Sequence, residues 1–177
     1  MKIAAILLFA SLLLAASTPS DHPVYAGNTL QRPDNYRDWV FLSSGYGMAY
    51  GTVAGHEQFT NVFVPQWAYR EFTRTGKWPD QTMFVVEERE AASRGSINKS
   101  GHYQSDLAGI GVEVKDSRFP DKWAYYNFGP GDQQNPPNPK QACWQCHEDH
   151  ASVEHTFVQF YPTLIPAAKK FGVYRER

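Results

Sequence analysis

The sequence predicts an α+β fold in which a mainly antiparallel β-sheet is flanked by helices. Two observations lead to this class: segments with strand character dominate the middle of the 177-residue chain, and segments with helical character lie towards its two ends. A third observation is the short turn "SRFPD", which joins two of the strand segments directly.

The first helix is expected in the stretch "RPDNYRDWVFLSS". Pro33 and Asp34 are a favourable pair at the start of a helix, because proline suits the first helical position and aspartate suits the first turn. An apolar face would then be formed by Trp39, Val40 and Leu42. We therefore predict a helix that begins at Pro33.

A strand and a second helix are predicted next. The segment "HEQFTNVFV" has the alternation of a strand, in which one set of side chains alternates with another: Phe59, Asn61 and Phe63 against Thr60, Val62 and Val64. Pro65 then opens a helix, "PQWAYREFTRT", and Gly76 is placed to cap its C-terminal end.

Three more strands follow. "TMFVVEERE" is a strand whose second half becomes charged, and "LAGIGVEVKD" and "KWAYYNFG" are two strands joined by the turn already mentioned. The polar, glycine-containing stretch "AASRGSINKSGHYQS" is expected to be a loop. The proline-rich stretch "PGDQQNPPNPKQ" is expected to have no regular structure.

A helical pattern returns near the C-terminus. Apolar residues at steps of three and four run through Val153, Phe157, Phe160 and Tyr161, until Pro162 interrupts them. This pattern predicts a helix over the segment that ends at Tyr161.

The N-terminus indicates export. Lys2 is followed by the short apolar run "IAAILLFASLLLAAS" and then by polar chain, the pattern of a secretory signal peptide. A membrane span needs about 20 apolar residues, so a retained anchor is the weaker alternative. Cleavage is expected after Ala16 or after Ala26, and the sequence leaves both sites open. We predict a signal peptide over 1–26, a single domain over 27–177 and a periplasmic location.

The composition excludes one class of partner and leaves two interpretations of the aromatic residues. The formal net charge is −1 with both signs interspersed, which gives no electrostatic footprint for nucleic acid. Five Trp, ten Tyr and eleven Phe are compatible with a compact core, and equally with walls around a large, flat, apolar cofactor.

The stretch "CWQCHEDHASVEHTF" holds both cysteines and three of the six histidines. A structural zinc site would need a second ligand pair, and a thioredoxin-like dithiol would need to follow the first strand of a βαβ unit, so both are weak interpretations. A Cys-x-x-Cys-His stretch in an exported protein instead indicates covalent haem attachment. We predict one haem c, with thioether bonds from Cys143 and Cys146 and with His147 as the axial ligand, all on a C-terminal haem-attachment helix.

The sixth coordination position decides the function. His150 and His155 follow His147 too closely to reach the opposite haem face. The other candidates are two loop histidines and the two methionines outside the signal peptide, of which Met83 is expected in the core: His56, His102, Met48 and Met83. If none of these is a ligand, the iron is five-coordinate and open to a small molecule.

Seven blocks in order resemble the cytochrome P-460 and cytochrome c′-beta family: "NYRDWV", "FTNVFV", "AYREFTRTGKWPD", "GVEVKDSRF", "KWAYYNF", the Cys-x-x-Cys-His stretch and "FVQFYPTL". The resemblance covers residues 36–164. It implies a small, mostly antiparallel β protein that forms a homodimer and holds one five-coordinate c-type haem by its C-terminal motif.

The same resemblance divides the family by chemistry. Members of the P-460 type oxidise hydroxylamine and have a lysine covalently linked to the haem, together with a distal carboxylate. The chain has Val86 at the lysine position and Gly111 at the carboxylate position. Three other lysines fall in a turn, in a loop and after a strand, and none is an evident substitute for the missing one: Lys77, Lys99 and Lys115. The chain therefore looks closer to the c′-beta type.

The distal pocket is expected to be apolar, formed by Phe59, Phe84 and Val86, with an ordinary core position as the alternative for the two phenylalanines. Strand alternation points Glu87 to the opposite face, whereas Glu113 shares the face of Gly111 and is kept as a weak candidate for a catalytic base.

Such a pocket suits neutral diatomic ligands such as NO and CO, in scavenging or sensing. The alternatives are an oxidoreductase that converts hydroxylamine or NO, and a simple electron-transfer cytochrome with a periplasmic redox partner.

Overall fold

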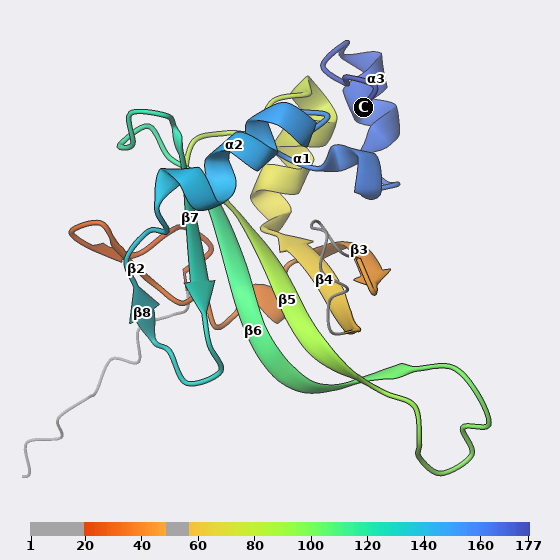
Figure 1. Cartoon of the computed structure of the whole chain (residues 1–177). Helices are drawn as coiled ribbons and strands as arrows, with labels where there is room; N and C mark the ends of the chain where they lie inside the picture. Colours follow the sequence, from red (N-terminus) through yellow and green to blue (C-terminus); the bar gives the residue numbers. More distant parts are fainter. Residues whose placement is uncertain (1–19, 49–56) are drawn as a thin grey trace, which may run out of the picture.

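The structure is a computed structural model that describes residues 20–48 and 57–177 (Figure 1). Its main sheet is antiparallel and has five strands in chain order: β3 (Val40–Tyr46), β4 (Gln58–Val64), β5 (Thr82–Ala92), β6 (Tyr103–Lys115) and β7 (Trp123–Phe128). Figure 1 shows three helices gathered over one end of this sheet: α1 (Gln66–Thr75), α2 (Lys140–His150) and α3 (Ile165–Lys170). The predicted α+β class is confirmed.

A second, small antiparallel sheet has three short strands in the order β1 (Tyr25–Ala26), β2 (Thr29–Gln31) and β8 (Gln134–Asn135). β8 lies within the proline-rich stretch that was expected to be irregular, so this part of the prediction is wrong. Asn135 donates a side-chain hydrogen bond to the Asn127 carbonyl, which ties the stretch to β7. Within the described ranges, no helix is both long enough and apolar enough to span a membrane.

The strand register decides which residues share a face of the main sheet. Val62 pairs with Val86, Val86 with Gly111, and Gly111 with Asn127, so the four residues form one row across four strands. Paired residues of an antiparallel sheet point to the same side, and neighbours along a strand point to opposite sides. The row therefore lies on the sheet face that also holds Val64.

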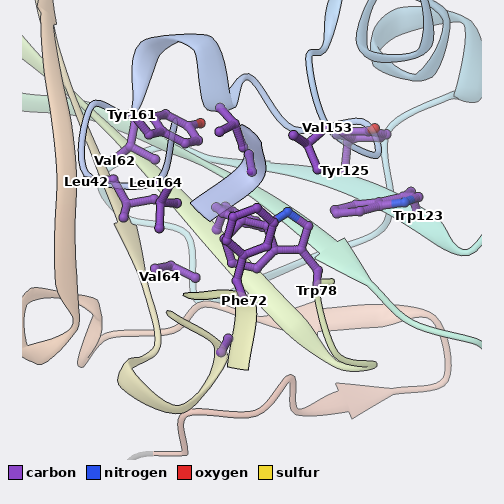
Figure 2. Close-up of a cluster of buried hydrophobic side chains, with 14 residues drawn as sticks. Leu42, Val62, Val64, Phe72, Trp78, Trp123, Tyr125, Val153, Tyr161 and Leu164 are labelled. Carbon is purple, nitrogen blue, oxygen red and sulfur yellow. The ribbon is translucent and has the colours of Figure 1, made fainter. Parts of the chain in front are cut away.

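Each face of the sheet has its own apolar core. Figure 2 shows the cluster on the helix-covered face, where Phe72 of α1 and Trp78 stack with ring centroids 4.0 Å apart, and which also includes Val64 and Leu164. The opposite face packs against the N-terminal segment through a second cluster, which includes Met83 as the sequence predicted. Both faces are thus buried against other parts of the chain.

Helix α1 forms where the sequence predicted it. Pro65 precedes its first residue, and Ala68 and Phe72 supply its buried side. Gly76 follows the last turn with a φ of 73°, and its N–H donates to the Phe72 carbonyl at 2.7 Å. This left-handed conformation costs glycine little, which explains why the helix ends there.

The helix predicted from Pro33 is wrong. The chain forms only a short 3₁₀ turn over Tyr36–Asp38, and Trp39 then adopts an extended conformation that leads into β3. Val40 instead pairs with Val64 at the edge of the main sheet. The apolar residues after Pro33 fit a helical spacing, but the segment is too short for that spacing to distinguish a helix from a strand. Pairing with β4 then stabilises the strand.

The helix predicted through Val153 and Phe157 is also wrong. Helix α2 ends at His150, and a tight turn follows in which Glu154 and His155 have positive φ values of 36° and 60°. A regular α-helix cannot pass through such residues. Only a 3₁₀ turn over Val158–Phe160 remains of the predicted helix.

Candidate functional site

A cavity of about 340 Å³ lies on the helix-covered face of the main sheet, within the size range of small-molecule sites. Its walls come from the strands, from α2 and from the chain after α2. The described residues that line it are Ser43, Gly45, Met48, Thr60, Val62, Val86, Glu88, Gly111, Val112, Glu113, Tyr125, Tyr126, Asn127, Ala142, Cys143, Cys146, His147, Phe157, Phe160 and Tyr161.

Helix α2 brings the predicted haem ligands to this cavity. Pro139 precedes the helix, and Cys143, Cys146 and His147 follow within it at steps of three and four residues, which places them on one face. Both thiols are free; Cys143 is half-buried and Cys146 is exposed. The motif thus lies on a regular helix, as predicted, and this helix packs beside β7.

His147 is held on three sides. Its ring lies between Tyr125 and Phe157, with centroids 4.5 and 4.6 Å away. Its Nδ1 is 2.7 Å from the main-chain carbonyl oxygen of His155, and because a carbonyl can only accept, Nδ1 is the donor. In the neutral imidazole the lone pair is then on Nε2, which faces Glu113, whose Oε1 is 3.5 Å away. His147 is arranged as a ligand through Nε2.

Glu113 is the buried acid of the cavity. Its Oε2 has no hydrogen-bond partner among the described residues. Burial raises the pKa of this carboxyl, and the nearby His147 opposes that shift only in part. It lies on the face of Gly111, as strand alternation predicted, while Glu87 points to the opposite side and contacts Tyr36.

The two positions singled out by the family resemblance both line the cavity. Val86 and Gly111 are neighbours in the strand register, so together they form an apolar patch on its wall. A Cβ atom on Gly111 would lie 3.9 Å from the Val86 Cβ, an ordinary contact, so packing does not demand a glycine there. None of the described residues that line the cavity is a lysine or an arginine.

The two phenylalanines expected in the distal pocket lie elsewhere, and that expectation is wrong. Phe59 is on the opposite face of β4 from Thr60 and Val62, and its ring packs 4.8 Å from that of Tyr46. Phe84 is fully buried in the core of the helix-covered face, with its ring edge-on to that of Trp78 at 4.7 Å. The aromatic walls come instead from residues that the sequence reasoning did not assign to the site: Tyr125, Phe157, Phe160 and Tyr161.

Of the candidates for a sixth ligand that the structure describes, Met48 alone lines the cavity. Met83 is buried in the core of the opposite face. His102 stacks on Tyr46 and faces Glu57, outside the cavity lining. His56 lies outside the described residues.

The residues present fit a haem. Two thiols and an imidazole project from one helix face towards a cavity whose other walls are mostly aliphatic and aromatic. The carboxyl oxygen of Glu113 that has no hydrogen-bond partner is a polar atom that a bound group would meet. Flat apolar macrocycles need such walls, and the imidazole Nε2 is a common axial ligand of haem iron. Fold and site together define a haem-binding protein of the cytochrome class.

The comparison with known families agrees and is more specific. The model of the family described as Cytochrome P460 matches residues 33–158, which is well over half of the chain. The chain belongs to the cytochrome P460 family. A comparison with curated proteins gives no match.

Proposed function

We propose that the chain is an exported mono-haem c-type cytochrome of the c′-beta type, which binds NO or a similar neutral diatomic molecule for scavenging or sensing. Cys143 and Cys146 form the thioether bonds and His147 is the proximal ligand. The observation that supports the choice of ligand is the apolar wall formed by Val86 and Gly111, in a cavity whose described lining holds no lysine.

The residues around the cavity would hold the haem and determine which ligands reach it. When bound, the haem supplies an iron with one position open to the lone pair of a small ligand. His147 holds it from one side, and its hydrogen bond to the His155 carbonyl fixes the tautomer. The side chains of Val62 and Val86 carry no hydrogen-bonding group, so they give a bound ligand no hydrogen bond, which favours neutral diatomic molecules.

The absorption spectrum of the ferric and ferrous protein, with and without NO, tests this proposal. A five-coordinate, high-spin spectrum in both oxidation states is expected, together with a clear change when NO is added to the ferrous form. A six-coordinate, low-spin spectrum in both states would contradict it and would support a simple electron carrier. Met48 at the cavity wall is the observation that favours this second candidate, and Met48→Leu would then convert the spectrum to high-spin.

Turnover of hydroxylamine with an artificial electron acceptor would support the oxidoreductase alternative instead. Glu113 is the only buried carboxyl among the described residues that line the cavity, and it would be the base in that case. Loss of the turnover in Glu113→Gln would assign this role to it.

We further propose that export is followed by cleavage after Ala16. The alternative site, after Ala26, lies at the end of β1, which pairs with β2. Cleavage there would also remove Asp21, whose Oδ1 accepts hydrogen bonds from Asn35 Nδ2 at 2.7 Å and from Trp39 Nε1 at 2.9 Å. Asp21 and β1, which both lie between the two sites, are thus part of the packed domain.

N-terminal sequencing of the protein purified from the periplasm tests the cleavage site. We expect the mature chain to begin at residue 17, with Asp21 retained. A mature chain that begins at Gly27 would contradict the proposal, and the thermal stability of a protein truncated to that residue would show what β1 contributes.

A further inference from the structure

The turn formed by residues 153–156 is strained and contacts His147 through the His155 carbonyl. Val153 and Thr156 close it by two main-chain hydrogen bonds, of which Thr156 N–H to the Val153 carbonyl is 2.6 Å long. The two central residues, Glu154 and His155, both have positive φ. This is the pattern of a type I′ turn, which normally takes asparagine or glycine at these positions. Neither residue is of that kind, so the conformation is imposed by the surroundings.

The core of the protein holds the turn in place. The Thr156 hydroxyl donates to the Val153 carbonyl at 2.6 Å and accepts a hydrogen bond from Trp78 Nε1 at 3.1 Å. Thr156 is fully buried and Trp78 is nearly so, and the indole stacks on Phe72. We call this pair of hydrogen bonds the Trp78–Thr156 clamp.

A second tie fixes the outer side of the turn. Lys115 Nζ donates to the main-chain carbonyl of Trp78 at 2.8 Å and to Glu154 Oε2 at 2.7 Å. It therefore connects the turn to the residue that supplies the indole donor of the clamp. The ring of His155 is also restrained, since its Nε2 lies 3.0 Å from Glu148 Oε2 and its face is tilted against Trp144.

These contacts fix the direction of the His155 main-chain carbonyl, which is the hydrogen-bond acceptor of His147. His155 O accepts from His147 Nδ1 at 2.7 Å. A hydrogen bond of this kind makes an imidazole ligand more basic and fixes its orientation. Backbone strain that persists at such a place is evidence of a positioning role, because the surrounding contacts must offset its cost.

We propose that Thr156 is a positioning residue for the proximal ligand. Through the Trp78–Thr156 clamp it holds the strained turn, which directs the His155 carbonyl onto His147 Nδ1 and thereby sets the basicity of that ligand. This inference rests on the proposed role of His147 as the axial ligand.

The experiment compares Thr156→Val with the wild-type holoprotein. Valine keeps the shape of threonine but removes the hydroxyl, so both hydrogen bonds of the clamp are lost. We expect the iron–histidine stretching frequency of the ferrous protein, measured by resonance Raman spectroscopy, to fall and the midpoint potential to rise, because a less basic imidazole stabilises the ferric state less. Thr156→Ser, which keeps the hydroxyl, is expected to restore both values.

The matched control is Thr82→Val. Thr82 is also fully buried and its hydroxyl donates to a main-chain carbonyl, that of Pro79, at 2.7 Å. It should lower the stability to a similar extent without a change in the frequency or the potential. Trp78→Phe removes the indole donor while it keeps an aromatic ring at this position, and it is a second route to the same result if the valine variant at Thr156 does not fold.

The two possible failures are distinguishable. A wild-type ferrous protein with no iron–histidine band would overturn the proposed ligation itself. A wild-type protein that has the band, with the same frequency and potential in Thr156→Val, would overturn only the positioning role, whatever the loss of stability.

Discussion

Replacement of both Cys143 and Cys146 by alanine is expected to remove every covalent bond between the chain and its haem. Both thiols lie on the face of α2 that borders the cavity, and the chain has no other cysteine. A thioether needs the sulfur of cysteine, so alanine leaves no attachment point. His147 remains, and the cavity can still bind haem without a covalent bond.

The measurement is the intact mass of the purified protein together with a haem-stained denaturing gel. The wild-type mass should exceed that of the mature polypeptide by one haem, and the double variant should show the polypeptide alone. The single variants are the controls, because each keeps one thioether. Covalent haem that survives in the double variant would reveal a third bond and would contradict the inference drawn from Val86.

The sequence predicted those parts of the fold whose signal is local. β4 and β5 were recognisable from the composition and patterning of their own residues, and α1 from the proline before it and the capping glycine after it. The strand after Pro33 was not recognisable in this way. It lies at the edge of the sheet and is stabilised by pairing with β4, and no feature of its own sequence indicates that partner.

The site divides in the same way. The spacing of Cys143, Cys146 and His147 located the helix face that borders the cavity. The expectation for Phe59 failed because both alternating sets of β4 hold apolar residues, so the pattern alone does not say which set faces the helices. The His155 carbonyl was beyond sequence reasoning, because a main-chain acceptor has no residue signature and its direction depends on contacts with residues such as Trp78.

The second large effect is expected at Glu87, on the face of the sheet opposite the cavity. Glu87 is 1% exposed and is the centre of a polar network. It accepts hydrogen bonds from Tyr36 Oη at 2.6 Å, from Asn61 Nδ2 at 3.0 Å and from Arg89 Nε at 2.9 Å, and it also pairs with Arg37. Such a carboxylate is stabilising only while its partners are present.

Glu87→Gln is expected to lower the free energy of unfolding at neutral pH by about 3 kcal/mol. The amide removes the charge that both arginines face, and its NH₂ group opposes donors where the carboxylate accepted. For a domain of this size the loss corresponds to a fall in Tm of roughly 6–12 °C. Urea denaturation of both proteins measures it. Glu71→Gln on the surface of α1, which removes an exposed pair with Arg74, is the control and should cost about 0.5 kcal/mol or less.

The difference between wild type and Glu87→Gln should also depend on pH. Burial by itself would raise the pKa of Glu87, but the hydrogen bonds from Tyr36, Arg89 and Asn61 and the charge of Arg37 together lower it from its ordinary value of 4.5. A carboxyl with a lowered pKa in the folded state contributes stability that is complete above its unfolded pKa and is lost as the pH falls through the folded value. The difference in the free energy of unfolding between the two proteins should therefore be constant from neutral pH down to about pH 5 and should decrease below that pH. A gap that stays constant into strong acid would mean that packing, and not the charge of Glu87, accounts for the effect.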